Sequence, residues 1–263
     1  MTRILFLFVL SFIGTTPSQA LESGEALFSH TDQLMKTYVI PVGEHQSKVD
    51  YTKLKAHRSE LDSLVKEYEA VPLDAFKAWS QKKQIAFLID AYNVMTFKLI
   101  VDNYPVSSIR NIGGLFVSNF SNQWKKKFFN ILGGKAETLD TIEQDILRKE
   151  YHENRIHFAL VCASKSCPPI RNEAYVEAKL EQQLNDQRKK FIQDPERNLY
   201  KDDVQLLNLS MIFKWYRSDF VENEEQIKQW IAPFISDDVK VQARIKEQAT
   251  RIRYLDYNWN MND

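Results

Sequence analysis

The sequence is short of three features that would each assign it to a familiar class of protein. Its 263 residues include seven glycines, two cysteines and no excess charge, with 35 basic and 35 acidic residues. So few glycines argue against an all-β sandwich, which needs many tight turns. Two cysteines without a second pair or a histidine pair make a poor zinc site, and we expect no metal and no cofactor. The balanced charge excludes a global field that would attract nucleic acid or an anionic membrane.

The first 20 residues have the pattern of a secretory signal peptide. Arg3 gives a positive start, residues 4–13 form a short apolar run, and residues 16–20 end in small side chains at Ala20. The run is shorter than the about 20 apolar residues that a membrane span needs. We therefore expect residues 1–20 to be removed, leaving an exported protein, periplasmic or secreted, with no membrane span. The alternative is a buried N-terminal helix.

The rest of the chain predicts an α+β fold, helix-rich, with a small mixed sheet and β-hairpins. We expect an N-terminal helical lead over residues 21–70 and a single α+β domain over residues 71–263. Hydrophobic spacing and capping residues predict helices over residues 52–68, 74–79, 81–102, 141–149 and 224–235, one from near residue 172 to 193, and one after Ser210. Hairpins are expected over residues 128–139 and 197–208, and strands over residues 156–163 and 251–259.

Both cysteines lie close to the predicted strand of residues 156–163. Cys167 would follow this strand in a loop before a helix, and a helix N-terminus with Lys165 and Arg171 nearby favours a thiolate. Cys167 is therefore a candidate nucleophile. In an oxidising compartment, however, an even cysteine count and a four-residue spacer favour a disulfide between Cys162 and Cys167. A pair of inert buried thiols is the third alternative.

His157 is the second candidate for catalysis, as a general base. A lone histidine on an apolar strand is more often a satisfied core residue. Its partner cannot be named from spacing, and the candidates are Glu143, Asp145 and Arg148 on the helix after the first hairpin. Because side chains alternate along a strand, His157 and Cys162 would face opposite sides and be poorly placed to act as a direct pair.

Two polar residues, Asp90 and Asn93, interrupt the otherwise apolar helix over residues 81–102. A buried polar group without a partner costs about 1–3 kcal/mol, so these residues are either structural hydrogen bonders or part of a site. Asn93 can offer its amide to a strand end or to a substrate carbonyl, and Tyr92 offers an aromatic surface with a polar tip. The candidate ligand-binding residues are Asn93, Tyr92, Glu143, Lys165 and Arg171.

Three motifs resemble a known family: Ala91–Asn93, Ile156–Leu160 and Ser166–Pro169 are similar to those of DUF547, a domain of unknown function. The resemblance implies that the motif residues form one domain, and it carries no established catalytic residue or cofactor. The family pattern has histidine where this chain has Gln144, and aspartate where it has Asn258. Glutamine does not titrate near neutral pH and asparagine cannot hold a histidine as a carboxylate would, so these departures favour binding over catalysis.

The leading hypothesis is an exported protein that binds a small polar or peptide-like ligand in a cleft near Asn93, His157 and Cys167. The first alternative is a cysteine-dependent hydrolase or acyl transferase, in which Cys167 attacks an acyl group, His157 or an unidentified residue is the base, and Asn93 orients the substrate or stabilises an oxyanion. The second is a non-catalytic structural or protein-interaction domain, suggested by the aromatic residues of the segment 213–216 and by Trp230. Whether the protein is an enzyme, and its oligomeric state, are left open.

Overall fold

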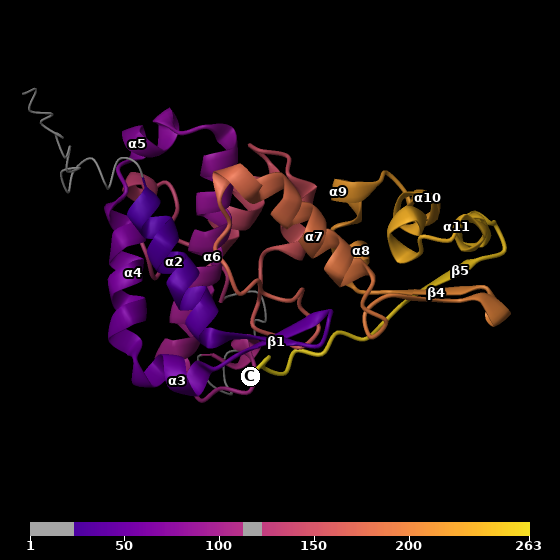
Figure 1. The fold of residues 1–263 in the computed structure, drawn as a ribbon, viewed down its shortest axis with the longest axis horizontal. Helices are drawn as coiled ribbons and strands as arrows, with labels where there is room; N and C mark the ends of the chain where they lie inside the picture. The colour runs from indigo at the N-terminus through magenta and orange to yellow at the C-terminus, as the bar shows by residue number, and fades with distance from the viewer. Residues whose placement is uncertain (1–23, 113–122) are drawn as a thin grey trace, which may run out of the picture.

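The computed structural model describes residues 24–112 and 123–263, which form the helix-rich α+β fold that the composition predicts (Figure 1). The α-helices are α2 (Glu25–Tyr38), α3 (Tyr51–Ala56), α4 (Arg58–Ala70), α5 (Leu73–Ala78), α6 (Gln81–Asn103), α7 (Leu180–Ile192), α8 (Ile212–Trp215), α9 (Arg217–Phe220), α10 (Glu224–Ile235) and α11 (Val239–Lys246). Short helical turns are η1 (Ile109–Asn111), η2 (Leu132–Gly134), η4 (Asn154–Phe158), η5 (Glu177–Lys179) and η6 (Asp202–Val204), and η3 (Thr141–Arg148) is a π-helix. The strands are β1 (Val39–Val42), β2 (Gln46–Val49), β3 (Leu199–Lys201), β4 (Leu206–Leu209) and β5 (Arg251–Tyr254). The predicted signal peptide lies outside the described residues.

Helix α6 is the centre of the larger of two hydrophobic clusters. It begins as predicted, with the Ser80 hydroxyl accepting a hydrogen bond from the Lys83 N–H. Helices α2, α3 and α4 pack against it, as Figure 1 shows for α2 and α4 beside α6. By length and composition alone α6 could cross a membrane, but 89% of its most apolar window is buried inside the protein. It is a buried core helix, as the sequence predicts from apolar residues on most of its faces.

The second cluster lies in the C-terminal part of the chain. Strands β3 and β4 form the predicted antiparallel hairpin, and β5 adds to β4 in parallel. Helices α7, α8, α10 and α11 contribute buried side chains around Phe213, and Figure 1 shows α10 and α11 beside the β4–β5 edge. Phe158, from the middle of the chain, packs here rather than against α6.

The C-terminal tail runs from the second cluster back to the first. The predicted strand over residues 251–259 is confined to β5, after which the tail lies along the cysteine segment. The Lys165 N–H donates to the Asn260 carbonyl at 2.8 Å, and the Asn262 N–H donates to the Ala163 carbonyl at 3.2 Å. The Asn262 carbonyl in turn accepts from the Val49 N–H at 3.0 Å. The tail therefore joins both clusters to the segment that carries the cysteines.

The predicted strand over residues 156–163 is wrong. The chain forms η4 over Asn154–Phe158, and residues 159–163 belong to neither sheet of the described part of the chain. A single bridge to the tail, Ser164 with Met261, follows the segment. The Asn93 amide donates to the Ala159 carbonyl at 3.1 Å, and the Asn93 carbonyl accepts from the Val161 N–H at 3.0 Å. Because one side chain satisfies backbone groups that a sheet would otherwise satisfy, this buried segment needs no neighbouring strand.

Three further predictions are corrected in part. The helix expected from near residue 172 begins at Leu180 as α7. The helix over residues 52–68 is divided at His57 into α3 and α4. The hairpin over residues 128–139 is reduced to one bridge, Ile131 with Ala136, around two glycines with positive φ. The strand pair β1–β2 was not predicted.

Candidate functional site

A cavity of about 310 Å³ lies where the two hydrophobic clusters meet. Six aromatic side chains line it: Tyr92, Trp124, Trp215, Tyr216, Tyr257 and Trp259. The other lining residues are Lys125, Asp140, Glu143, Gln144, His157, Leu160, Cys162, Cys167, Pro168 and Ile212. Helices α6 and α8, the π-helix η3, the turn η4, the cysteine segment and the tail therefore all contribute to one cavity.

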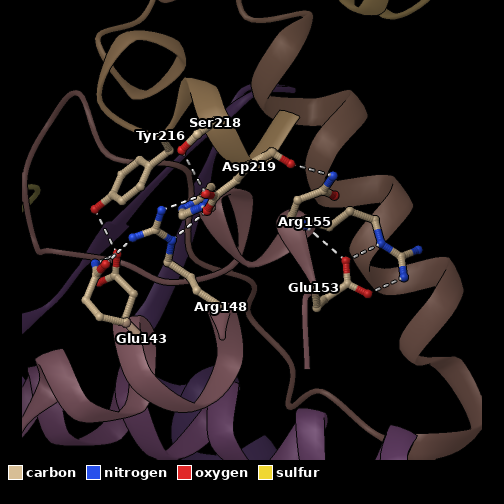
Figure 2. A network of polar contacts seen from close by, with 10 residues as sticks. Glu143, Arg148, Glu153, Arg155, Tyr216, Ser218 and Asp219 are labelled. Carbon is tan, nitrogen blue, oxygen red and sulfur yellow. Dashed lines mark hydrogen bonds and ion pairs between the residues drawn. The ribbon is translucent and has the colours of Figure 1, made fainter. Parts of the chain in front are cut away.

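Glu143 is a nearly buried carboxylate on η3, with 7% of its surface exposed. The hydroxyl of Tyr216 donates to one carboxylate oxygen at 2.7 Å, and the Gln144 amide donates to the same oxygen at 2.9 Å. The Tyr92 hydroxyl donates to the other oxygen at 3.2 Å. Figure 2 shows the Tyr216 contact. All three donors are neutral. A π-helix is rare and often marks a functional site, and this one places Glu143 and Gln144 at the cavity.

His157 contacts a second carboxylate, Asp219, which differs from Glu143 in having a charged hydrogen-bond donor. Its Nε2 lies 2.6 Å from the Asp219 carboxylate, and its ring stacks on Tyr216 with the centroids 3.9 Å apart. Arg148 donates to both Asp219 oxygens, at 2.5 and 2.6 Å (Figure 2). Burial would raise the pKa of Asp219, but hydrogen bonds from His157 and Arg148 outweigh it and hold the pKa well below its ordinary value. Of the three candidate partners for His157, Arg148 belongs to this network through Asp219.

The two cysteines are adjacent but not bonded. Their sulfur atoms are 2.8 Å apart, longer than the about 2.05 Å of a disulfide, and both thiols are free. The disulfide that the sequence favours is therefore not formed in this structure. The Cys162 N–H donates to the Cys167 sulfur, and the Cys162 sulfur lies 3.2 Å from the Tyr257 hydroxyl.

The hydrogen bonds around the sulfurs make the two thiols unequal. Burial would raise the pKa of Cys167, but hydrogen bonds from the Cys162 thiol and backbone N–H outweigh it, so its pKa lies below the ordinary value. Burial, and then the contact with Cys167, raise the pKa of Cys162 well above the ordinary value. The helix terminus expected beside Cys167 is absent, because α7 begins at Leu180. Cys162, rather than a helix dipole, favours the Cys167 thiolate.

The structure brings four predicted site residues to the cavity, namely Cys167, His157, Tyr92 and Glu143. It also places Cys162 and His157 on the same cavity, where the strand prediction had set them on opposite faces. Among the described residues, no hydrogen bond joins His157 to either sulfur.

Three predicted ligand-binding residues do not line the cavity. Both ends of the Asn93 amide are occupied by the backbone of residues 159–161, so Asn93 positions the segment beneath the site. Lys165 is held by its backbone to the tail, and Arg171 pairs with Glu173. Of the two departures from the family pattern, Gln144 lines the cavity, while Asn258 accepts from the Asn260 N–H outside it.

Sequence reasoning missed Asp219, Trp124 and Trp259. No local spacing indicates Asp219, because it lies 62 residues from His157 in the chain. The tryptophans gave a weak signal, as scattered aromatic residues in segments of otherwise polar sequence. Of the aromatic residues that suggested a protein-interaction surface, Phe213 is buried, Trp230 packs against the second cluster, and Trp215 is 45% exposed beside the cavity.

Residues 76–192 match the model of a family described as "Protein of unknown function, DUF547". Comparisons with curated proteins and with solved structures found no match. The matched segment contains Tyr92, Glu143, His157 and both cysteines, whereas Asp219 and the C-terminal aromatic residues lie beyond it. Among residues 24–112 and 123–263, no group of three His, Cys, Asp or Glu side chains is placed to hold a metal ion. Residues 76–192 therefore match the DUF547 domain, the family that the motifs resemble.

Proposed function

We propose that the protein is exported and that it binds a small polar or peptide-like ligand in the cavity between the two clusters. The observation that carries the proposal is the convergence of polar groups on one aromatic-walled cavity: Glu143, His157 and Cys167 come from three separate segments. A volume of about 310 Å³ lies at the lower end of the range of small-molecule pockets, about 300–1,000 Å³. Aromatic walls with a few polar groups are typical of such pockets.

The binding proposal is tested by tryptophan fluorescence, because Trp124, Trp215 and Trp259 line the cavity. Blocked dipeptides, with an acetylated amino end and an amidated carboxyl end, are titrated into the mature protein. We expect saturable changes in emission and slower alkylation of Cys167 when a dipeptide is bound. The proposal is wrong if no dipeptide at millimolar concentration changes the emission, the melting temperature or the alkylation rate.

A second function, cysteine-dependent hydrolysis or acyl transfer, is favoured by one specific observation: the Cys167 thiolate is stabilised beside a cavity that is also lined by His157, whose Nε2 contacts Asp219 behind the lining. In this reaction the thiolate forms a bond to an acyl carbon while the bond to the leaving group breaks. Protonated His157 gives its proton to the leaving group. Water or an acceptor amine then releases the acyl group from the sulfur and returns a proton to His157.

The enzyme alternative is tested by alkylating the reduced protein with iodoacetamide from pH 5 to 9 and mapping the labelled peptides. Cys167 should react at a lower pH than an ordinary thiol, whose pKa is about 8.5, and Cys162 should react only slowly. In a Cys162→Ala variant the reaction of Cys167 should move to higher pH, because the thiol hydrogen bond is lost. A control without reductant decides the disulfide question: if neither thiol reacts until reduction, the two are bonded and catalysis by Cys167 is excluded.

A further inference from the structure

We infer that the ligand of the cavity carries an organic cation, an amine or a quaternary ammonium group, which binds between Glu143 and the aromatic walls. This inference rests on the proposed binding function and names its ligand class. It is carried by two independent features of the site: the charge of the lining residues and the arrangement of the aromatic rings.

The lining residues carry an excess of negative charge. Two acids, Asp140 and Glu143, face the cavity together with one lysine, Lys125. Lys125 is exposed, whereas Glu143 is buried. Behind the lining, Arg148 and Asp219 neutralise each other as an ion pair. A positively charged ligand would therefore neutralise the net negative charge of the lining residues.

Glu143 in particular has no cation bonded to it among the described residues: the charge of Arg148 acts on Glu143, but the Arg148 guanidinium donates to Asp219 and Gln144. The hydrogen bonds to Glu143 come from Tyr92, Tyr216 and Gln144, and it forms no ion pair within the described part of the chain. The undescribed segment 113–122 contains no lysine or arginine. Buried carboxylates are usually paired with a cation, since neutral donors return only part of the lost hydration. A bound ammonium group would supply the missing partner.

The aromatic rings form a continuous group beside this carboxylate. The ring centroids of Tyr257 and Trp259 are 4.5 Å apart, those of Trp215 and Tyr257 4.9 Å, and those of Trp124 and Trp259 6.1 Å. Aromatic faces attract cations, and cages of such rings bind quaternary ammonium ligands. One guanidinium group already contacts this group of rings, since Arg110 lies 4.8 Å from the Trp259 centroid. A second, Arg148, lies 5.1 Å from the centroid of Tyr216, another ring of the cavity wall.

An anionic ligand is disfavoured by the same residues. It would meet the carboxylates of Asp140 and Glu143, and among the described lining residues Lys125 is the one lysine or arginine. The guanidinium of Arg148 is occupied by Asp219 and Gln144. A carboxylate or phosphate ligand would therefore be repelled rather than bound.

The test compares choline with 3,3-dimethyl-1-butanol, a neutral alcohol of nearly the same shape in which carbon replaces the charged nitrogen. Both are titrated into the mature protein by calorimetry and tryptophan fluorescence. We expect choline to bind at least about tenfold more tightly, because the alcohol loses the cation–π and carboxylate attractions. Equal affinity for the two, or tighter binding of the alcohol, overturns the inference.

Two variants locate the cation. In Glu143→Gln we expect the affinity for choline to fall about tenfold while that for the alcohol changes less than about twofold. In Trp215→Leu, which alters a ring that is 45% exposed, we also expect weaker choline binding with an unchanged fold. The matched controls are Glu222→Gln, at an exposed carboxylate outside the cavity, and Trp230→Phe, in the second cluster. If Glu143→Gln does not fold, Trp215→Leu decides the question.

The outcomes separate this inference from the binding proposal. If blocked neutral dipeptides bind and choline does not, the inference of a cationic ligand is wrong, but the proposed binding function still holds. If neither dipeptides nor choline bind, the inferred ligand class and the proposed binding function are both wrong. Choline binding that is unchanged in both variants places the cation elsewhere and also overturns the inference.

Discussion

Two carboxylates near the cavity have different surroundings: Glu143 lines the cavity, and Asp219 lies behind His157. Asp219, on α9, is paired with the guanidinium of Arg148 and with His157. On the side formed by α6, η3 and α8, Glu143 is held by two tyrosine hydroxyls and an amide. Asp219 is bonded directly to a guanidinium, whereas among the described residues Glu143 accepts hydrogen bonds from neutral groups alone. The first arrangement neutralises the carboxylate and orients His157, and the second leaves the carboxylate with neutral donors at the cavity.

The largest effect is expected from removing the charge of Asp219. Asp219→Asn leaves Arg148 without its carboxylate and weakens the contact to His157, whose side chain is 2% exposed. Breaking such a partly buried pair should lower the free energy of unfolding by about 2–3 kcal/mol. Urea denaturation measures it, with Asp237→Asn as the control at an exposed aspartate. A decrease in the free energy of unfolding of less than about 0.5 kcal/mol would show that the Asp219 pair does not stabilise the fold. Asp219 and Glu143 would then not differ in the way described above.

The same pair predicts how stability depends on acid. The pKa of Asp219 is lowered in the folded state, so the folded protein binds fewer protons there than the unfolded chain. The contribution of ionised Asp219 to the free energy of unfolding is complete above its pKa in the unfolded chain, about 3.9. This contribution is lost as the pH falls toward the lower pKa of the folded state. The difference in unfolding free energy between the wild type and Asp219→Asn should therefore be constant near neutral pH and shrink below about pH 4. A difference that grows in acid would contradict this account.

A smaller effect is expected on the Glu143 side, since three donors share the carboxylate. Tyr216→Phe removes the 2.7 Å hydrogen bond and keeps the ring that stacks on His157. The cost should be about 1 kcal/mol in the free energy of unfolding, because Tyr92 and Gln144 remain. Tyr175→Phe is the matched control: its buried hydroxyl has no hydrogen-bond partner among the described residues, so its removal should be neutral or slightly stabilising. Equal losses in the two variants would mean that the Tyr216 hydroxyl does not hold Glu143.

The elements that local chemistry determines could be predicted from the sequence. The cap of Ser80, the hairpin of β3 and β4, and helix α10 each follow from residues that are neighbours in the chain. The role of Asn93 was recognised only as an alternative, because its partners are 66 and 68 residues away. The strand prediction for residues 156–163 failed for the same reason. An apolar run shows that a segment is buried, but not whether a strand or a side chain satisfies its backbone.

The candidate site was predicted less completely than the fold. The sequence indicated Cys167, His157, Tyr92 and Glu143, which are chemically distinctive residues within the DUF547 segment. It did not indicate Asp219 or the aromatic wall formed by Trp215 and the tail, because these approach the site only through tertiary packing. A short periodic pattern contains no information about such contacts.

The path of the tail has a consequence for the order in which the protein is made. Tyr257 and Trp259 form part of the cavity wall, and the tail backbone holds Ser166 and Lys165 in place. Chains are synthesised from the N-terminus, and earlier regions can fold before later ones have been added. Helix α6 and its neighbours can therefore pack first, but the cavity lacks a wall until Trp259 has been added. A growing chain can therefore acquire its hydrophobic core while the cavity is still open on one side.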